Sequence, residues 1–228
     1  ARRSTDGTPV AVKVARADPT ARAQLLREAE ALRAVGPPAA PALLEAGTLA
    51  DGTPFLALER IALPTLRERL AAAGGRLPRE EVGPRALAVL DALGAVHAAG
   101  WAHCDLTPAN VFAGADVSAA RLFDFGLAER LDEEAPPPGP GLAFAGTPEY
   151  MAPEQCEGRA RPDARSDVYA FGAVLHHLLL GRPPFTGSPA EVQQAHLNLR
   201  PRRPSELGPV SPSVEQVLLR CLAKDPAG

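Results

Sequence analysis

The stretch His103-Cys104-Asp105-Leu106-Thr107-Pro108-Ala109-Asn110 contains an Asp and an Asn five residues apart, and Asp124-Phe125-Gly126 begins fourteen residues after Asn110. In this order, the first Asp can face a substrate hydroxyl, while the Asn and the second Asp can hold Mg²⁺ against phosphate oxygens. The pattern indicates a phosphoryl-transfer site. It predicts that Asp105 orients the acceptor hydroxyl and takes its proton, and that Asn110 and Asp124 bind metal.

Four further motifs accompany this pair along the chain. They are Val10-Ala11-Val12-Lys13, Gly146-Thr147-Pro148-Glu149-Tyr150-Met151-Ala152-Pro153-Glu154, Ser166-Asp167-Val168-Tyr169-Ala170-Phe171-Gly172 and Gly181-Arg182-Pro183-Pro184-Phe185. Together and in this order, the motifs resemble the bacterial Hanks-type (eukaryotic-like) Ser/Thr protein kinase domain over nearly all 228 residues. Several ordered motifs are far more specific than any one of them.

The resemblance implies an α+β fold with two lobes. Residues 1–60 would form the small lobe, an antiparallel sheet with one helix, without the family's first strand and Gly-rich loop. Residues 61–228 would form the larger, mainly helical lobe, without its last helices. It also implies ATP with Mg²⁺ or Mn²⁺ as cofactors, and proteins with Ser or Thr hydroxyls as substrates.

Composition excludes several other classes of protein. A net charge of −3 and a pI near 6.0 provide no basic footprint for nucleic acid. Three scattered cysteines are too few for a disulfide framework, which fits a reducing compartment. No apolar run is long enough to cross a bilayer. We therefore expect a cytoplasmic domain, either free or part of a longer, membrane-anchored protein, and the oligomeric state stays open.

Local patterns predict the elements that carry these motifs. An Asp6-Gly7 turn predicts a hairpin over residues 1–15, and Asp51-Gly52 predicts another between strands at 43–47 and 55–59. Helices are expected at 19–35, begun by Asp18 and closed by Gly36, at 78–99, and at 168–180 with Ser166 as its cap. The Pro- and Gly-rich segment 136–141 predicts an irregular activation loop.

Lys13 and Glu28 are the expected pair at the phosphates. Only Lys13 and Lys224 are lysines among 24 basic residues, and a compact ammonium at a strand end suits the α- and β-phosphates. On the helix at 19–35, Glu28 shares a face with Leu25 and Leu32, because these residues are three and four positions apart.

Other roles follow only from the resemblance. Leu58 would be the gatekeeper, Glu59 to Ile61 the hinge whose backbone meets the adenine, and Ala11 and Phe112 the two sides of the adenine slot. Supporting roles fall on the following residues: His103 and Phe125, which would stack with Leu32 and Leu43; Thr147 beside the catalytic Asp; Asp167 as an anchor of the catalytic loop; and Glu154.

The chain departs from the family's pattern in four places. Cys104 stands where an Arg usually precedes the catalytic Asp, and Thr107 stands where a Lys usually lies near the γ-phosphate. The chain starts just past the expected Gly-rich loop, and it stops before the Arg that normally pairs with Glu154, as expected for a piece of a longer protein. From Asp124 through Gly146 it also contains no Ser, Thr or Tyr, so we expect activity without phosphorylation of this segment.

Two other functions compete with a protein kinase. Thr107 and the absent Gly-rich loop would suit a pseudokinase, a module that binds nucleotide or partners without efficient transfer. A small-molecule phosphotransferase of the aminoglycoside kind shares the His-x-Asp-Leu-x-x-x-Asn loop. Against the first, Lys13, Asp105, Asn110 and Asp124 are all present. Against the second, the segment 146–154 resembles a platform for peptide substrates.

Overall fold

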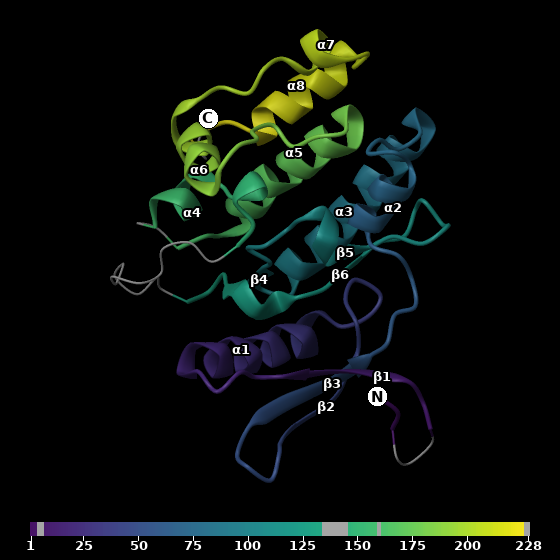
Figure 1. Cartoon of the computed structure of the whole chain (residues 1–228), viewed down its shortest axis with the longest axis vertical. Coiled ribbons are helices and arrows are strands. Elements are labelled where there is room, and N and C mark those ends of the chain that lie inside the picture. Colours follow the sequence, from purple (N-terminus) through teal and green to yellow (C-terminus); the bar gives the residue numbers. More distant parts are fainter. Residues whose placement is uncertain (4–6, 134–145, 159–160, 226–228) are drawn as a thin grey trace.

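The computed structural model describes residues 1–3, 7–133, 146–158 and 161–225, and these form a smaller and a larger part (Figure 1). The smaller part holds an antiparallel sheet with the order β1-β3-β2, made of β1 (Val10–Val14), β2 (Leu43–Thr48) and β3 (Pro54–Glu59). Helix α1 (Pro19–Val35) packs on this sheet. The α+β class with a small antiparallel sheet is therefore confirmed.

The predicted hairpin over residues 1–15 forms in the described residues, although Asp6 of its turn lies outside them. Its second strand is β1, and residues 1–3 run antiparallel beside residues 8–10. Arg2 and Pro9 form a bridge, and backbone hydrogen bonds join Ala1 to Val10 and Arg3 to Thr8. The second hairpin forms as expected, because β2 and β3 pair in antiparallel register around the Asp51-Gly52 turn.

Helix α1 follows its sequence signals at both ends. The Asp18 carboxylate accepts hydrogen bonds from the backbone N–H groups of Thr20 and Ala21, and the helix ends at Gly36, whose φ is 56°. Its buried face divides between two cores. Leu25 packs with Leu56 of the sheet, while Leu32 joins the core of the larger part. The helix therefore connects the two parts through packed side chains.

The larger part is mainly helical. Its helices are α2 (Leu66–Ala72), α3 (Arg79–Ala98), α4 (Pro153–Glu157), α5 (Ala164–Leu180), α6 (Pro189–Asn198), α7 (Pro204–Leu207) and α8 (Pro212–Cys221). Short strands flank the catalytic motifs: β4 (Trp101–Ala102) pairs with β7 (Glu129–Arg130), and β5 (Val111–Phe112) pairs with β6 (Arg121–Leu122). These pairings bring residues 103–110 and 123–126 to one place.

Helix α5 is buried on nearly every side, as its apolar sequence predicts. Its predicted cap was wrong: Asp163 is the N-cap, and Ser166 is the third helical residue, whose hydroxyl accepts from the Asp163 N–H. A Cβ atom at Gly172 would lie 2.7 Å from the Cβ of Cys221. Only glycine therefore lets α8 approach α5 this closely.

The predicted activation loop at 136–141 lies outside the described residues. Within the described ranges, no helix combines the length and apolar character needed to cross a membrane.

Protonation of the buried His196 in α6 should destabilise the fold. Its Nδ1 lies 2.9 Å from the Tyr169 hydroxyl, its ring is fully buried, and burial lowers its pKa to about 4. Because the unfolded chain takes up this proton near pH 6.5, the stabilising effect is complete above that pH and is lost as pH falls towards 4. We expect a loss of about 3 kcal/mol in that window.

The measurement is chemical denaturation of wild type and His196→Gln at several pH values between 4 and 7. The substitution should flatten the pH dependence in that window. Identical slopes for the two proteins would contradict the assignment.

Candidate active site

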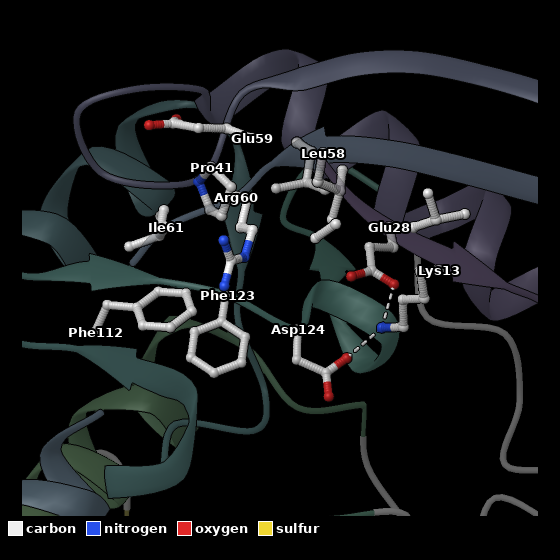
Figure 2. Close-up of a pocket in the computed structure, with 13 residues that line it drawn as sticks. Lys13, Glu28, Pro41, Leu58, Glu59, Arg60, Ile61, Phe112, Phe123 and Asp124 are labelled. Atoms are coloured by element: carbon white, nitrogen blue, oxygen red, sulfur yellow. Dashed lines mark hydrogen bonds and ion pairs between the residues drawn. The ribbon is translucent and has the colours of Figure 1, made fainter. Parts of the chain in front are cut away.

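Lys13 lies between two carboxylates from different parts of the chain (Figure 2). Its Nζ is 2.5 Å from Oε2 of Glu28 in α1 and 2.6 Å from Oδ1 of Asp124. Glu28 is buried, whereas the side chains of Lys13 and Asp124 are 40% and 47% exposed. The ammonium and the Asp124 carboxylate thus face the open side of the site, where an anionic ligand can reach them.

The pKa values of this group reflect burial opposed by charge. Burial lowers the pKa of Lys13, but the charges of Glu28 and Asp124 outweigh it, so that the pKa is raised above its ordinary value. Burial raises the pKa of Glu28, and the Lys13 ammonium opposes this rise. Lys13 is therefore a fixed cation over the whole physiological pH range.

A cavity of about 310 Å³ opens beside Lys13, between the two parts. Its lining includes the residues expected around an adenine, namely Ala11, Leu58, Ile61 and Phe112. In Figure 2, Phe112 lies on the opposite side from Leu58. Its ring stacks on that of Phe123, with centroids 4.1 Å apart and an angle of 22° between the planes. This pair forms a flat apolar floor suited to a planar heterocycle.

The Glu59 side chain points away from this cavity (Figure 2). Its carboxylate pairs with Arg121 at 2.7 Å and accepts the Ala42 backbone N–H at 3.2 Å. Burial raises its pKa, but these two contacts outweigh it and the pKa is lowered. Any contact from position 59 to an adenine edge would therefore come from its backbone.

Asp105 and Asn110 lie side by side in the catalytic loop, residues 103–110. The Asn110 amide donates to the backbone carbonyl and to Oδ2 of Asp105, each at 2.9 Å. Burial raises the pKa of Asp105, the nearby His103 opposes the rise, and Asp124 adds to it. A carboxylate with a raised pKa accepts a proton more readily than an ordinary Asp.

Thr147 contacts Asp105 through its backbone. Its N–H donates to Asp105 Oδ1 at 3.3 Å, and a Cβ at the preceding Gly146 would lie 3.5 Å from the same oxygen. The resemblance implied a supporting role for Thr147 without saying which atom carries it, and the described contact belongs to the main chain. It brings the described segment that begins at residue 146 against Asp105.

The Asp167 carboxylate holds the backbone of the catalytic loop in place through hydrogen bonds. Its fully buried carboxylate accepts the N–H groups of His103 and Cys104, each at 2.8 Å, and His97 Nε2 lies 2.8 Å from Oδ2. Cys104 and Asp124 are the two residues other than glycine with positive φ in the described part of the chain, at 62° and 65°. Such backbone conformations cost about 1–3 kcal/mol each and persist only where surrounding contacts impose them.

The expected stacking of His103 and Phe125 with Leu32 and Leu43 is also present. The rings of His103 and Phe125 are 4.8 Å apart, Leu32 and Phe125 belong to one core, and Leu43 packs against it. His103 Nδ1 accepts the Asp105 N–H at 3.3 Å, and Nε2 lies 3.1 Å from the Phe123 carbonyl, so both ring nitrogens have a partner. His103 is thus packed and hydrogen-bonded, and it does not face the cavity.

Two other expected residues have local partners. The Thr107 side chain is 2% exposed, and its hydroxyl accepts the Ala109 N–H at 3.2 Å, which caps the short helix Pro108–Asn110. Glu154 accepts a hydrogen bond of 2.6 Å from the Ser166 hydroxyl. Neither residue lines the cavity.

Several contributors were missed by the sequence reasoning. Phe123 and Pro41 line the cavity, and Gln155 donates to the Cys104 carbonyl at 2.7 Å. The position of Phe123 directly before Asp124 was an available signal for it. Gln155 and His97 carry no local signal, because their partners are 51 and 70 residues away in the sequence.

The oxygen donors at this site fit a magnesium ion. The Asp124 carboxylate and the Asn110 amide oxygen are hard ligands, and Mg²⁺ is commonly held by one or two such groups together with substrate phosphates. Among the described residues no group of three or more His, Cys, Asp or Glu side chains forms a self-sufficient metal site. The donor set therefore suits a metal that arrives with phosphate.

Comparison with known proteins agrees with this geometry. The protein kinase domain family matches residues 1–228. A probable serine/threonine-protein kinase of Streptomyces coelicolor is 35% identical over 229 residues, covering 96% of this chain and 34% of that protein. The serine/threonine-protein kinase PknB of Mycobacterium tuberculosis is 36% identical over 226 residues, covering 95% of this chain and 36% of that protein. The chain thus spans about a third of the length of these relatives.

Removal of the Thr107 hydroxyl should loosen the catalytic loop. Thr107→Val keeps the branched shape but leaves the Ala109 N–H without its acceptor, at an expected cost of about 1 kcal/mol. Thr107→Ser keeps the acceptor and should cost less. Denaturant titration of both variants measures the difference, and equal stabilities would show that the cap contributes nothing.

Proposed function

This chain belongs to the protein kinase domain family, and we propose that it is an ATP-dependent protein serine/threonine kinase acting through Lys13, Asp105, Asn110 and Asp124. The observation that carries the proposal is the position of Lys13, which bridges Glu28 and Asp124 at the edge of an apolar cavity with an aromatic floor. Family membership implies ATP and a divalent metal, and the donor set at Asn110 and Asp124 fits that metal.

Each residue has a task in this proposal. The Lys13 ammonium binds the α- and β-phosphates, and Glu28 holds it in place. Asn110 and Asp124 would hold Mg²⁺, which would neutralise charge on the phosphates. Asp105 orients the acceptor hydroxyl, whose oxygen bonds to the γ-phosphorus as the bond from phosphorus to the ADP oxygen breaks. The hydroxyl proton passes to Asp105 late in transfer, and its raised pKa favours this.

Proteins are the proposed substrates, with Ser or Thr as the acceptor. The support comes from the segment 146–154, which meets Asp105 through the Thr147 N–H and the α5 helix through Tyr150. The Tyr150 hydroxyl lies 2.7 Å from His177 Nδ1. An extended peptide could rest on this segment with its hydroxyl at Asp105.

Cys104, Cys156 and Cys221 are all free thiols, which supports a cytoplasmic location.

A transfer assay with radiolabelled ATP tests this function against its rivals. The acceptors are a generic Ser/Thr-containing protein and a panel of aminoglycosides. Label on Ser or Thr of the protein supports the proposal, and label on an aminoglycoside supports a small-molecule phosphotransferase. Nucleotide binding in titration calorimetry without transfer to either acceptor would identify a pseudokinase.

Asp124→Asn should abolish transfer and leave the fold intact. The substitution preserves shape but removes the charge that faces Lys13 and the metal, so a loss of at least about 100-fold in kcat is expected. Asp116→Asn is the matched control, because Asp116 is exposed and its carboxylate bonds only locally, to Ser118. Thermal unfolding verifies the fold of both, and wild-type turnover in Asp124→Asn would refute the assignment.

A further inference from the structure

The Glu129 carboxylate in β7 forms ion pairs with two arginines from distant parts of the chain. Arg27 Nη1 of α1 lies 2.7 Å from Oε1, and Arg161 Nε lies 2.7 Å from Oε2, so each carboxylate oxygen has its own guanidinium. The side chains of Glu129 and Arg161 are only 15% and 13% exposed. The Glu129–Arg161 pair is therefore shielded, unlike an ordinary surface ion pair, which water and salt weaken, whereas the Arg27 side chain is 44% exposed.

The three residues belong to segments that build the active site. Arg27 directly precedes Glu28, the partner of Lys13. Glu129 pairs with Ala102 of β4, which leads into the catalytic loop. Arg161 lies just before α5, whose Asp167 holds that loop from below. A single carboxylate therefore ties α1, the catalytic-loop strand and the approach to α5 together.

The charges are arranged as they would be around a bound phosphate. A phosphate on a loop typically orders it by attracting arginines from neighbouring elements. Here two arginines converge on a carboxylate that the chain itself provides, and residues 124–146 include no hydroxyl that could carry a phosphate. Arg161 also meets Glu133, at 3.1 Å, although that side chain is 52% exposed. Glu133 therefore adds a second, more exposed carboxylate beside Arg161.

We propose that Glu129 is a built-in anion that positions α1, and with it Glu28 and Lys13, without phosphorylation of the activation loop. Arg27 and Arg161 are positioning residues that act through this carboxylate. Without it, the two guanidinium groups repel each other and α1 loses its contact beside Glu28. The Lys13–Glu28 ion pair then forms in a smaller fraction of molecules. This inference rests on the proposed kinase function for its effect on rate, but not for its effect on α1.

The experiment compares four variants with wild type after phosphatase treatment. Glu129→Gln and Arg27→Gln remove one charge each, whereas Glu129→Asp and Arg27→Lys keep it. Asp132→Asn is the matched control, because the Asp132 carboxylate pairs with Arg130, two residues away, and among the described residues no hydrogen bond or ion pair joins it to α1 or to Arg161. Thermal unfolding identifies any variant that no longer folds.

Two readouts apply to every protein. Hydrogen–deuterium exchange of the α1 amides measures how often the helix opens or loosens from its neighbours, and it needs no activity. Steady-state kinetics separate KM for ATP from kcat. Both charge-removing variants should exchange α1 amides about 10-fold faster and lose about 10-fold in kcat/KM for ATP, with much of the loss in KM. The charge-keeping variants and Asp132→Asn should stay within about 3-fold of wild type.

Each outcome tests the positioning role of Glu129, the independence from phosphorylation or the kinase function. Unchanged α1 exchange in Glu129→Gln and Arg27→Gln would overturn the positioning role, whatever the rates are. Loss of wild-type activity on phosphatase treatment would overturn independence from phosphorylation. An inactive wild type with faster α1 exchange in the variants would refute the kinase function and leave the role of Glu129 intact. If Glu129→Gln does not fold, Arg27→Gln decides alone, because its side chain is 44% exposed.

Discussion

The buried carboxylate of Asp167 is the interaction on which the catalytic loop depends. A charge with no exposure to water is tolerated only where hydrogen bonds replace its hydration, and two backbone N–H groups and His97 do so here. One of these N–H groups belongs to Cys104, whose φ of 62° is unfavourable for a side chain. The buried helix α5 thus holds the loop in a shape that the loop would not keep alone, and this shape presents Asp105.

Lys13 links this loop system to the smaller part of the molecule. Its two carboxylate partners differ in character: Glu28 is buried and belongs to α1, whereas Asp124 is half exposed and follows the aromatic floor. In the proposed function, Lys13 binds phosphate and Asp124 binds metal. Nucleotide binding would therefore replace the Lys13–Asp124 contact and keep the Lys13–Glu28 contact. The position of α1 then becomes the variable that decides whether the site is complete.

The position of α1 rests on apolar packing and on charge. Leu32 and Phe125 share the main core, so that α1 packs directly on the turn that carries Asp124. Arg27, on the exposed side of the same helix, reaches Glu129. Packing alone tolerates small sliding movements of a helix, whereas the Arg27–Glu129 ion pair, whose carboxylate is largely buried and is also held by Arg161, restricts its rotation. Packing and the ion pair together explain how the Glu129 carboxylate can position α1.

The sequence by itself determined the parts of the molecule that depend on near neighbours. Asp18 and Gly36 mark the ends of α1 because capping acts within one helical turn, and Glu28 faces inward because the helical repeat aligns it with Leu25 and Leu32. The spacing of Asp105, Asn110 and Asp124 likewise predicted one site. In the structure Asn110 is hydrogen-bonded to Asp105, and the charge of Asp124 acts on Asp105.

Only the tertiary structure decided the rest. The local pattern predicts Ser166 as the cap of α5, but Asp163 caps the helix. Both residue types can cap, so the local pattern alone does not fix the start. The contacts of Glu129 span 102 residues to Arg27 and 32 to Arg161. Charged residues of this kind look like solvated surface in any local pattern. Their partners are set by the path of the folded chain, which brings distant segments to the same carboxylate.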